Sequence, residues 1–113
     1  ATFLGSGSET RDWVAVADAA RLLLLAGSVA SPETPTANGA TGVEVSVEAV
    51  VTQLFDALGV FRAPVFDGIA LPAVPVRYAG DPGPAQGWGW QPRVPLAEGI
   101  DDYLRWYAAE AGG

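Results

Sequence analysis

Three chemically versatile residue types are missing from the sequence, which contains no cysteine, no histidine and no lysine. Without cysteine there can be no disulfide bond, no thiolate nucleophile and no sulfur-ligated metal site. Without histidine, carboxylates alone would have to hold a metal ion, and these are scattered apart from the neighbours Asp101 and Asp102. We interpret that pair as negative charge placed early in a helix, where the helix dipole favours it. The sequence therefore predicts no metal site.

Positive charge is also scarce. All six basic residues are arginines, and the formal net charge at pH 7 is -7. Nonspecific binding of nucleic acid depends on basic patches, so this balance argues against a nucleic-acid partner. The leucine run at residues 22–25 is far too short for a bilayer, which needs about 20 apolar residues, and no N-terminal stretch resembles a signal peptide. We therefore expect no membrane partner, a soluble protein, and the cytoplasm as its compartment.

The chain is long enough for one domain or for part of one. It has 113 residues, 50% of them hydrophobic, which is enough to build a core. The candidate strands are few, short and separated by helices, so we expect no complete doubly wound sheet, and the apolar edges of such a piece need a cover. We predict a single, partial unit over residues 1–113 with a partner segment missing. Because Ala1 stands where an initiator methionine is expected, we also expect that it is not the natural start of the gene product.

The most regular pattern predicts a helix that begins after Ser46. Ser46 suits an N-cap, Glu48 stands in the first turn, and Gly59 ends the segment. Apolar residues recur at helical spacing on one face of this segment: Val47, Val50, Val51, Leu54, Phe55 and Leu58.

Other segments carry weaker signals. Helices are predicted at residues 18–26, ended by Gly27, and at residues 96–109, where Ile100, Leu104 and Tyr107 share one face. Turn chemistry marks residues 38–42. Short strands are predicted at three places: around Trp13, Val14 and Val16, at residues 63–66, and at residues 76–79. The prediction is an α/β fold of short strands with about three main helices.

The glycine-rich stretch GSGSET at residues 5–10 raises the question of a phosphate-binding loop. Such a loop needs a preceding strand, glycines where the backbone meets the phosphate, and a helix N-terminus directly after it. Here Thr10 replaces the third glycine of G-x-G-x-x-G, no G-K-[ST] follows, and Glu9 would place negative charge beside the phosphate. We interpret the stretch as a turn that leads into a strand.

Four segments follow one another in an order that resembles a known family. They are GSGSETRDWVAVADAARLLLL at residues 5–25, NGATGVEVSV at 38–47, PVRYAGDPGPAQGWGWQPRVPLAEGI at 75–100 and YLRWY at 103–107. This order resembles the C-terminal third of the extended short-chain dehydrogenase/reductases, the NAD-dependent nucleotide-sugar epimerase/dehydratase family. The resemblance covers nearly the whole chain. It implies that the chain is the C-terminal, substrate-binding portion of a Rossmann-type α/β protein.

The resemblance also implies what the chain does not contain. In that family a larger N-terminal Rossmann domain carries the glycine-rich cofactor loop and a Tyr-x-x-x-Lys catalytic pair, whereas the C-terminal segment mostly binds the nucleotide-sugar. This chain has no lysine and therefore cannot contain the pair. We accordingly expect no catalytic residue here, NAD or NADP bound by a domain outside this chain, and an N-terminal Rossmann domain as partner in the same or a separate polypeptide.

Three positions match substrate-binding residues of the family, namely Arg11, Asn38 and Arg77. Arg11 matches the arginine of the RD motif that commonly reaches the substrate diphosphate, which suits a guanidinium that pairs bidentately with phosphate oxygens; an ion pair with a nearby carboxylate is the alternative. Asn38 matches the asparagine of N-x-G-x-G, which often lies beside the substrate, although Ala40 alters that turn. A turn asparagine that bonds its own backbone is the alternative. Arg77 matches the second arginine of the R-P-G-x-x-x-R-Y loop.

Two further positions bear on the assignment of substrate-binding residues: one lacks an expected arginine, and the other matches the family but is interpreted as structural. Leu71 stands where the first arginine of the R-P-G-x-x-x-R-Y loop would contact the diphosphate, and loss of one guanidinium weakens such a contact unless another residue, with Arg62 as a candidate, compensates. A less charged substrate would fit this change. Asp18 matches the acidic residue after V-x-V, and we interpret it as a structural helix N-cap.

The aromatic residues near the C-terminus are predicted to be structural. Trp88 and Trp90 offer large rigid surfaces that pack a loop onto the core, with stacking against a sugar or base as the alternative. Tyr103, Trp106 and Tyr107 are predicted to pack the last helix.

Two classes of function follow from these features. The first is the substrate-binding part of an NAD(P)-dependent nucleotide-sugar epimerase, dehydratase or reductase that is not catalytic alone, and Arg11, Asn38 and Arg77 favour it. The second is a non-catalytic binding or interaction module that keeps the fold and self-associates, for example as a homodimer, or captures a partner through its apolar faces. Leu71 favours the second class.

Overall fold

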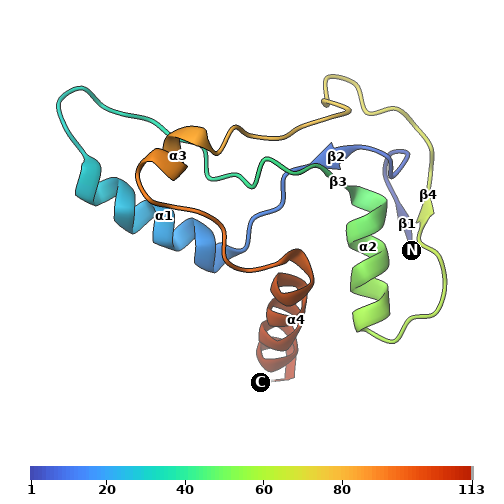
Figure 1. Cartoon of the computed structure of the whole chain (residues 1–113). Helices are drawn as coiled ribbons and strands as arrows, with labels where there is room; N and C mark the ends of the chain where they lie inside the picture. The colour runs from blue at the N-terminus through green and yellow to red at the C-terminus, as the bar shows by residue number, and fades with distance from the viewer. Residues whose placement is uncertain (113) are drawn as a thin grey trace.

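Two small β-ladders and four helices form the fold in this computed structural model, which describes residues 1–112 (Figure 1). In chain order the elements are β1 (Thr2–Phe3), β2 (Thr10–Arg11), α1 (Val16–Val29), β3 (Val45–Ser46), α2 (Val47–Ala57), β4 (Val65–Phe66), α3 (Gly83–Gly87) and α4 (Leu96–Gly112). β1 pairs with β4 in parallel and β2 pairs with β3 in antiparallel orientation, with Arg11 opposite Val45. The prediction of an α/β fold with short strands and three main helices is confirmed, and the short helix α3 is an addition to it.

α2 forms where the local signals predict it. The Ser46 hydroxyl accepts a hydrogen bond from the backbone N–H of Ala49 at 3.1 Å, and Glu48 lies in the first turn, where negative charge is favourable. Gly59 follows the last turn with a φ of 72°, a conformation that glycine adopts without strain. The predicted cap and stop are confirmed. On the predicted apolar face Val51 is buried and its helical neighbours are partly buried, whereas Leu58 lies beyond the helix and is 56% exposed.

α1 and two of the predicted strands differ from the sequence-based prediction. α1 begins at Val16, so the strand predicted around Trp13, Val14 and Val16 is wrong. The helix also continues through Gly27, because a glycine inside a helix costs only about 1 kcal/mol relative to alanine and does not force a stop. Residues 76–79 form no strand; one hydrogen bond, from Thr10 N to Val76 O at 2.8 Å, holds that segment beside β2.

The main core lies between α1, α3 and the loop that follows α3. Leu22, Ala85 and Trp90 are buried in it, and Trp88 packs against them. Only 1% of Trp90 is exposed, and its indole N–H donates a hydrogen bond to the backbone carbonyl of Asp18 at 3.0 Å. The prediction that Trp88 and Trp90 anchor a loop on the core is confirmed.

Asp18 stabilises this core, although not as the N-cap that we predicted. The N-cap of α1 is Ala15, and Asp18 lies inside the first turn with 1% of its surface exposed. Its carboxylate accepts hydrogen bonds from the backbone N–H groups of Arg93 and Val94, both at 3.0 Å, and pairs with Arg21 at 2.5 Å. Burial alone would raise the pKa of Asp18, but these bonds outweigh it and hold the pKa below its ordinary value. The structural role is confirmed, and it ties α1 to the segment before α4.

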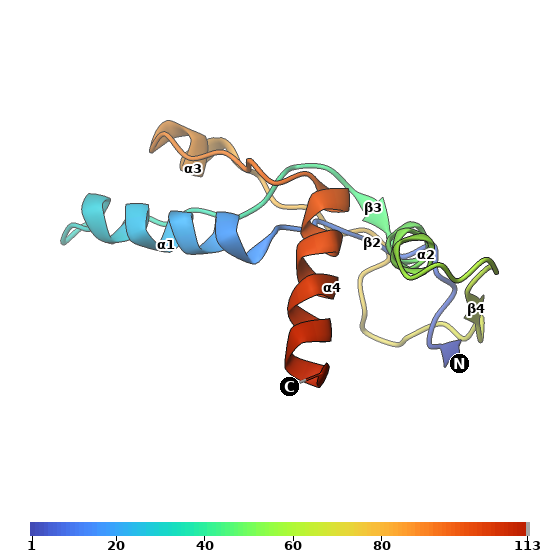
Figure 2. The same cartoon turned by 90° about the horizontal axis from the view of Figure 1, so that it is seen from below.

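α4 projects away from α1 and α3 (Figure 2). It packs against α2, and none of its residues is fully buried. Tyr103 packs against Trp106 and against Tyr107 along the helix, and the three side chains remain 55%, 57% and 56% exposed. The predicted packing of the last helix is therefore among its own aromatic residues, and these side chains are not buried. Packing between side chains of the same helix does not require a second element to cover them.

The described chain is more extended than a self-contained domain of its length. Its radius of gyration is 16.6 Å, whereas a compact domain of this size has a value of about 13 Å. Few hydrophobic side chains are fully buried, and many large ones are exposed. From residue 1 to residue 112, no helix has both the length and the apolar character needed to cross a bilayer.

Candidate functional site

Segments that are far apart in the sequence meet around β2. β3 pairs with β2 on one side, and the segment around Val76 lies against it through the hydrogen bond from Thr10. We refer to residues 10–12, 38–46 and 75–80 together as the β2 cluster. The three residues predicted to bind substrate all lie on its segments.

Asp12 holds these segments together. One of its carboxylate oxygens accepts hydrogen bonds from the Thr41 backbone N–H at 2.8 Å and the Thr41 hydroxyl at 2.6 Å. The other accepts from the backbone N–H groups of Gly42 at 2.8 Å and Gly80 at 3.2 Å. Burial raises the pKa of Asp12, but these hydrogen bonds outweigh it and lower the pKa below its ordinary value. The motif comparison assigns no role to Asp12. No signal in the sequence around Asp12 reveals this role, because its hydrogen-bond donors lie 29 to 68 positions further along the chain.

Arg11 is half-buried and carries an uncompensated positive charge. Its Nη1 donates hydrogen bonds to the backbone carbonyl of Thr10 at 2.6 Å and to that of Pro75 at 2.9 Å. Within residues 1–112 no carboxylate forms an ion pair with it. The alternative of an ion pair is therefore not what the structure contains, and the guanidinium retains donors for an anionic ligand.

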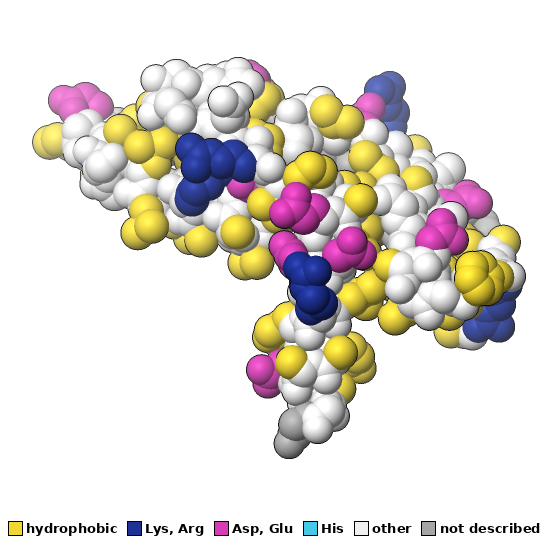
Figure 3. Space-filling view, turned by 60° about the horizontal axis from the view of Figure 1, so that its bottom comes forward, with side chains coloured by type: hydrophobic (Ala, Val, Ile, Leu, Met, Phe, Trp, Pro, Cys, Tyr) yellow, Lys and Arg dark blue, Asp and Glu magenta, His cyan; other side chains and the backbone are white. Residues whose placement is uncertain are grey.

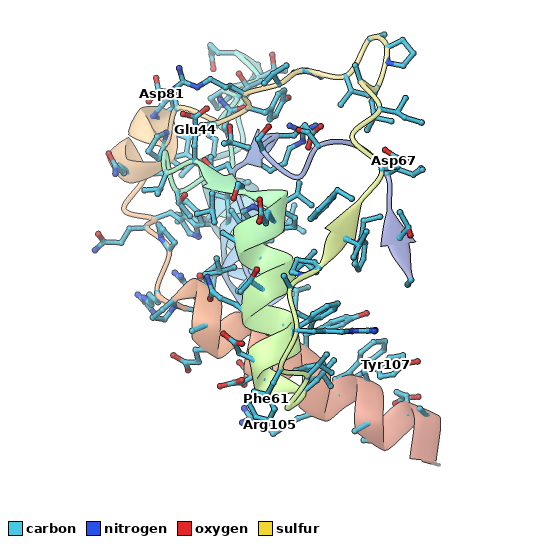
Figure 4. All side chains as sticks on the ribbon, turned by 90° about the vertical axis from the view of Figure 1, so that its right-hand side faces the viewer. Glu44, Phe61, Asp67, Asp81, Arg105 and Tyr107 are labelled. Atoms are coloured by element: carbon cyan, nitrogen blue, oxygen red, sulfur yellow. The ribbon has the colours of Figure 1, made fainter. Side chains whose placement is uncertain are left out.

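Arg77 is exposed and is held by a carboxylate of the chain. Its Nε and Nη2 donate to the two oxygens of Glu44 at 3.1 and 2.5 Å, and the Thr10 hydroxyl donates to the same carboxylate at 3.0 Å. These hydrogen bonds, from Arg77 first, lower the pKa of Glu44, and the same carboxylate raises the pKa of Arg77. In Figure 4, Glu44 lies at one end of the molecule, opposite the end where Tyr107 lies on α4. The charge of Arg77 is thus neutralised by its own chain.

Asn38 lies on an exposed part of the β2 cluster, next to Gly80. A side chain at Gly80 would place its Cβ 2.5 Å from that of Ala40 and 3.4 Å from that of Asn38. Because real Cβ atoms do not approach as closely as 2.5 Å, glycine is needed at position 80 for these segments to pack together. The cluster therefore brings the Asn38 segment to the one that carries Arg77.

Leu71, which replaces an expected diphosphate ligand, and Arg62, its candidate substitute, both lie outside the β2 cluster. Leu71 is on the surface of the loop after β4, and Arg62 is in the exposed loop between α2 and β4. The fold accordingly places Arg62 on a different segment from the residues that it was proposed to assist.

The glycine-rich stretch at residues 5–10 is a turn between β1 and β2, as predicted. The carboxylate of Glu9 accepts hydrogen bonds from the backbone N–H groups of Ser6 and Gly7, both at 2.9 Å. These bonds, with that of Ser6 first, lower the pKa of Glu9. The N–H donors that would hold a phosphate in such a loop are therefore occupied by a side chain of the loop itself.

No acidic cluster in the described part of the chain could hold a metal ion, since no three such side chains converge there.

Comparison with known proteins places this arrangement in a family, although no protein-family profile matches the chain. UDP-glucose 4-epimerase of Mycolicibacterium smegmatis is 35% identical over 96 residues, which is 85% of this chain and 30% of that protein. The structure of Thermotoga maritima UDP-glucose 4-epimerase with UDP-glucose matches 97% of the chain, with 26% identity and a TM-score of 0.85. MoeE5 in complex with UDP-glucuronic acid and NAD also matches 97% of the chain, with 28% identity and a TM-score of 0.86. The chain belongs to the extended short-chain dehydrogenase/reductase family.

Within the extended short-chain dehydrogenase/reductases, the chain corresponds to the C-terminal portion of the fold, as its motif order predicts. It spans 30% of the length of the M. smegmatis protein and 36% and 37% of the two solved structures. The match includes nearly all of the described elements, so the β2 cluster and the projecting α4 both belong to the family fold.

Proposed function

We propose that this chain is the substrate-binding part of an NAD(P)-dependent nucleotide-sugar epimerase, dehydratase or reductase, and that it is not catalytic alone. The observation that carries the proposal is Arg11, a half-buried guanidinium without an ion pair in the described chain, at the centre of a cluster of predicted ligand-binding segments. Two relatives are UDP-glucose 4-epimerases, and one of the solved structures contains UDP-glucose. A UDP-sugar is therefore the ligand class that we assign to the site.

The chemistry of the β2 cluster suits a diphosphate. Arg11 has unused N–H donors that can form two parallel hydrogen bonds to phosphate oxygens. Arg77 already binds one oxyanion through two nitrogens, and a phosphate can replace the Glu44 carboxylate with the same geometry. Asn38 supplies an exposed amide that can donate to and accept from ligand hydroxyls. In this assignment the chain binds and orients the ligand.

The hydride chemistry requires groups that this chain lacks. It has no lysine and thus no Tyr-x-x-x-Lys pair. We propose that residues 1–113 form one partial unit and that an N-terminal dinucleotide-binding Rossmann domain, in the same or a separate polypeptide of the cytoplasm, holds NAD or NADP. A nicotinamide cofactor bound there would supply the hydride chemistry, while this chain holds the nucleotide-sugar diphosphate in place. The MoeE5 structure contains both NAD and UDP-glucuronic acid, which supports the use of a nicotinamide cofactor together with a nucleotide-sugar.

Ligand-induced thermal protection tests the proposal. We expect UDP-glucose to raise the Tm of the chain, because a ligand that binds only the folded state stabilises it. Arg11→Ala should remove this protection, because the loss of a charged hydrogen bond costs about 2 kcal/mol, which is about 30-fold in Kd. Arg105→Ala is the matched control, since Arg105 is an exposed arginine on α4 that pairs with Asp102. Equal protection of wild type and Arg11→Ala would refute the assignment of Arg11 to phosphate.

The ion pair between Arg77 and Glu44, together with Leu71, favours a second candidate function. With one arginine replaced and another neutralised, the chain can instead be a non-catalytic interaction module that keeps the fold. This alternative predicts self-association or partner capture that UDP-glucose does not change. Sedimentation that gives a compact monomer at every concentration would count against it.

A further inference from the structure

Two bridges join the segments of the β2 cluster that carry Asn38 and Arg77. One is the ion pair between Glu44 and Arg77, which lies at the surface, where the Arg77 side chain is 77% exposed. The other is the half-buried carboxylate of Asp12, which accepts four hydrogen bonds from these two segments. Three of the four donors are backbone N–H groups, and the fourth is the hydroxyl of Thr41. The second bridge therefore depends on one carboxylate, which directly follows β2.

Only the Asp12 bridge can persist when a ligand binds Arg77. In the proposed function a phosphate replaces the Glu44 carboxylate at Arg77, and this exchange removes the ion pair. The hydrogen bonds to Asp12 come from backbone N–H groups and a hydroxyl, so the same exchange leaves them in place. Because Asp12 directly follows Arg11, this bridge also fixes Arg11 relative to both segments.

Two of the donors to Asp12 are glycines that other residues could not replace without strain or a clash. Gly42 adopts a φ of 79°, which glycine reaches without strain, and a Cβ there would lie 3.3 Å from the Pro82 ring. At Gly80 a Cβ would lie 2.5 Å from that of Ala40. The backbone at both donors is thus closely packed, and the carboxylate meets it in a fixed geometry.

Positive charge is too sparse for the β2 cluster to bind an anion without accurate placement of its arginines. The formal net charge of the chain is -7, and the cluster contains two arginines, Arg11 and Arg77, and two carboxylates, Asp12 and Glu44. On the face shown in Figure 3, the basic side chains form a few separate groups, and acidic side chains lie beside most of them. Long-range attraction requires an excess of charge of one sign. The affinity for a diphosphate therefore depends on both guanidinium groups reaching it at once.

We propose that Asp12 is a positioning residue for ligand binding, which keeps Arg11 and Arg77 in register for one ligand. The inference rests on the proposed function and adds to it the group that makes separate segments act as one site. Asparagine at position 12 would keep the shape of the side chain but not its bonds. One carboxylate oxygen accepts two donors of Thr41 and the other accepts two backbone N–H groups. Whichever way the amide is oriented, its NH₂ group meets two donors that it cannot accept.

Isothermal titration with UDP-glucose tests this role. We expect Asp12→Asn to raise Kd at least about tenfold, because the two arginines no longer reach the ligand together. Asp18→Asn is the matched control, since Asp18 also accepts backbone N–H groups from a distant segment but lies outside the β2 cluster. This control should lower the Tm and leave Kd unchanged. Circular dichroism at the temperature of the titration checks that both variants are folded.

A double-mutant cycle with Arg77→Ala separates positioning from a general loss of stability. In the wild type, Arg77→Ala should weaken binding about tenfold, because a charged hydrogen bond to phosphate is lost. In the Asp12→Asn background the same substitution should weaken binding much less, because Arg77 is already out of register; such coupling marks residues that act together. In the Asp18→Asn background the loss should again be about tenfold, since distant sites act independently.

Three results would overturn the inference. They are equal Kd values for the wild type and Asp12→Asn, an equal loss of affinity in Asp12→Asn and Asp18→Asn, and an effect of Arg77→Ala that is the same with and without Asp12. If Asp12→Asn does not fold, Thr41→Val takes its place, because it removes the hydroxyl that donates to Asp12 at 2.6 Å. Thr41→Val should raise Kd about threefold and the control Thr41→Ser should not. Equal Kd values for these two variants would then overturn the inference.

The failure of this inference is distinguishable from the failure of the proposed function. If the wild-type chain does not bind UDP-glucose, the proposed function fails and the inference fails with it. If the wild type binds UDP-glucose through Arg11 and Asp12→Asn binds it equally well, the ligand assignment stands and the role given to Asp12 is wrong.

Discussion

At the scale of single residues, two carboxylates organise the β2 cluster in different ways. Asp12 binds backbone N–H groups of two distant segments and thereby fixes their positions. Glu44 occupies the guanidinium of Arg77, which the motif order assigns to the ligand. Arg11 has no such partner in the described chain. In the proposed site Arg11 could therefore bind an anion directly, whereas Arg77 would first have to release Glu44.

Release of Arg77 should strengthen ligand binding. Glu44→Gln removes the competing negative charge, and we expect UDP-glucose to bind about threefold more tightly, because exposed ion pairs of this kind are weak. Isothermal titration of wild type and variant measures the change. Glu110→Gln, an exposed carboxylate near the end of α4, is the control and should leave Kd unchanged. Weaker binding by Glu44→Gln would mean that Glu44 holds Arg77 in the binding position and does not compete with the ligand.

The sequence alone indicates the candidate arginines of the site but not the carboxylates that hold its segments together. Arg11, Asn38 and Arg77 stand in motifs whose order can be compared along the chain. Asp12 cannot be recognised in this way, because its hydrogen bonds reach Thr41 across 29 positions and Gly80 across 68. Such contacts depend on the assembled fold and leave no local pattern.

At the scale of elements, helices with local end signals are predictable and those held by tertiary contacts are less so. α2 has a serine cap, an acidic first turn and a glycine stop, and it forms over the predicted residues. α1 begins at Val16 after an alanine cap, and its Asp18 serves the packing of the Trp90 loop and not the helix end. Its start therefore could not be derived from the sequence around it.

Asp18 should make the stability of the fold depend on pH. Asp18→Asn weakens the hydrogen bonds to Arg93 and Val94 and the pair with Arg21, and we expect the free energy of unfolding to fall by about 2 kcal/mol at pH 7. The folded pKa of Asp18 is lowered, so its contribution is present above about pH 4 and is lost as the pH falls through the folded value. The difference between wild type and variant should accordingly shrink in acid.

Urea denaturation at pH 7 and pH 3 measures this difference. Asp56→Asn, at an exposed carboxylate of α2, is the control and should change the free energy of unfolding by less than about 0.5 kcal/mol at either pH. A loss for Asp18→Asn that is the same at both pH values would contradict the role given to the charged carboxylate.

At the scale of the whole molecule, the sequence predicts both the fold class and the presence of apolar surface that the chain itself does not bury. Its short strands alternate with helices and leave apolar surface without a partner, which the exposed leucines of α1 and the aromatic residues of α4 bear out. The sequence does not predict which side of α1 is exposed to solvent. The apolar residues of α1 surround much of the helix, and only the inward position of Asp18 and Arg21 fixes its orientation.

The central claim is that the β2 cluster of this chain binds a nucleotide-sugar. The most direct measurement is an NMR titration of the isotope-labelled chain with UDP-glucose, followed through its backbone amide resonances. The account predicts saturable shifts concentrated in residues 10–12, 38–46 and 75–80, with α4 unaffected. Absence of shifts at saturating ligand, or shifts concentrated outside the β2 cluster, would contradict it.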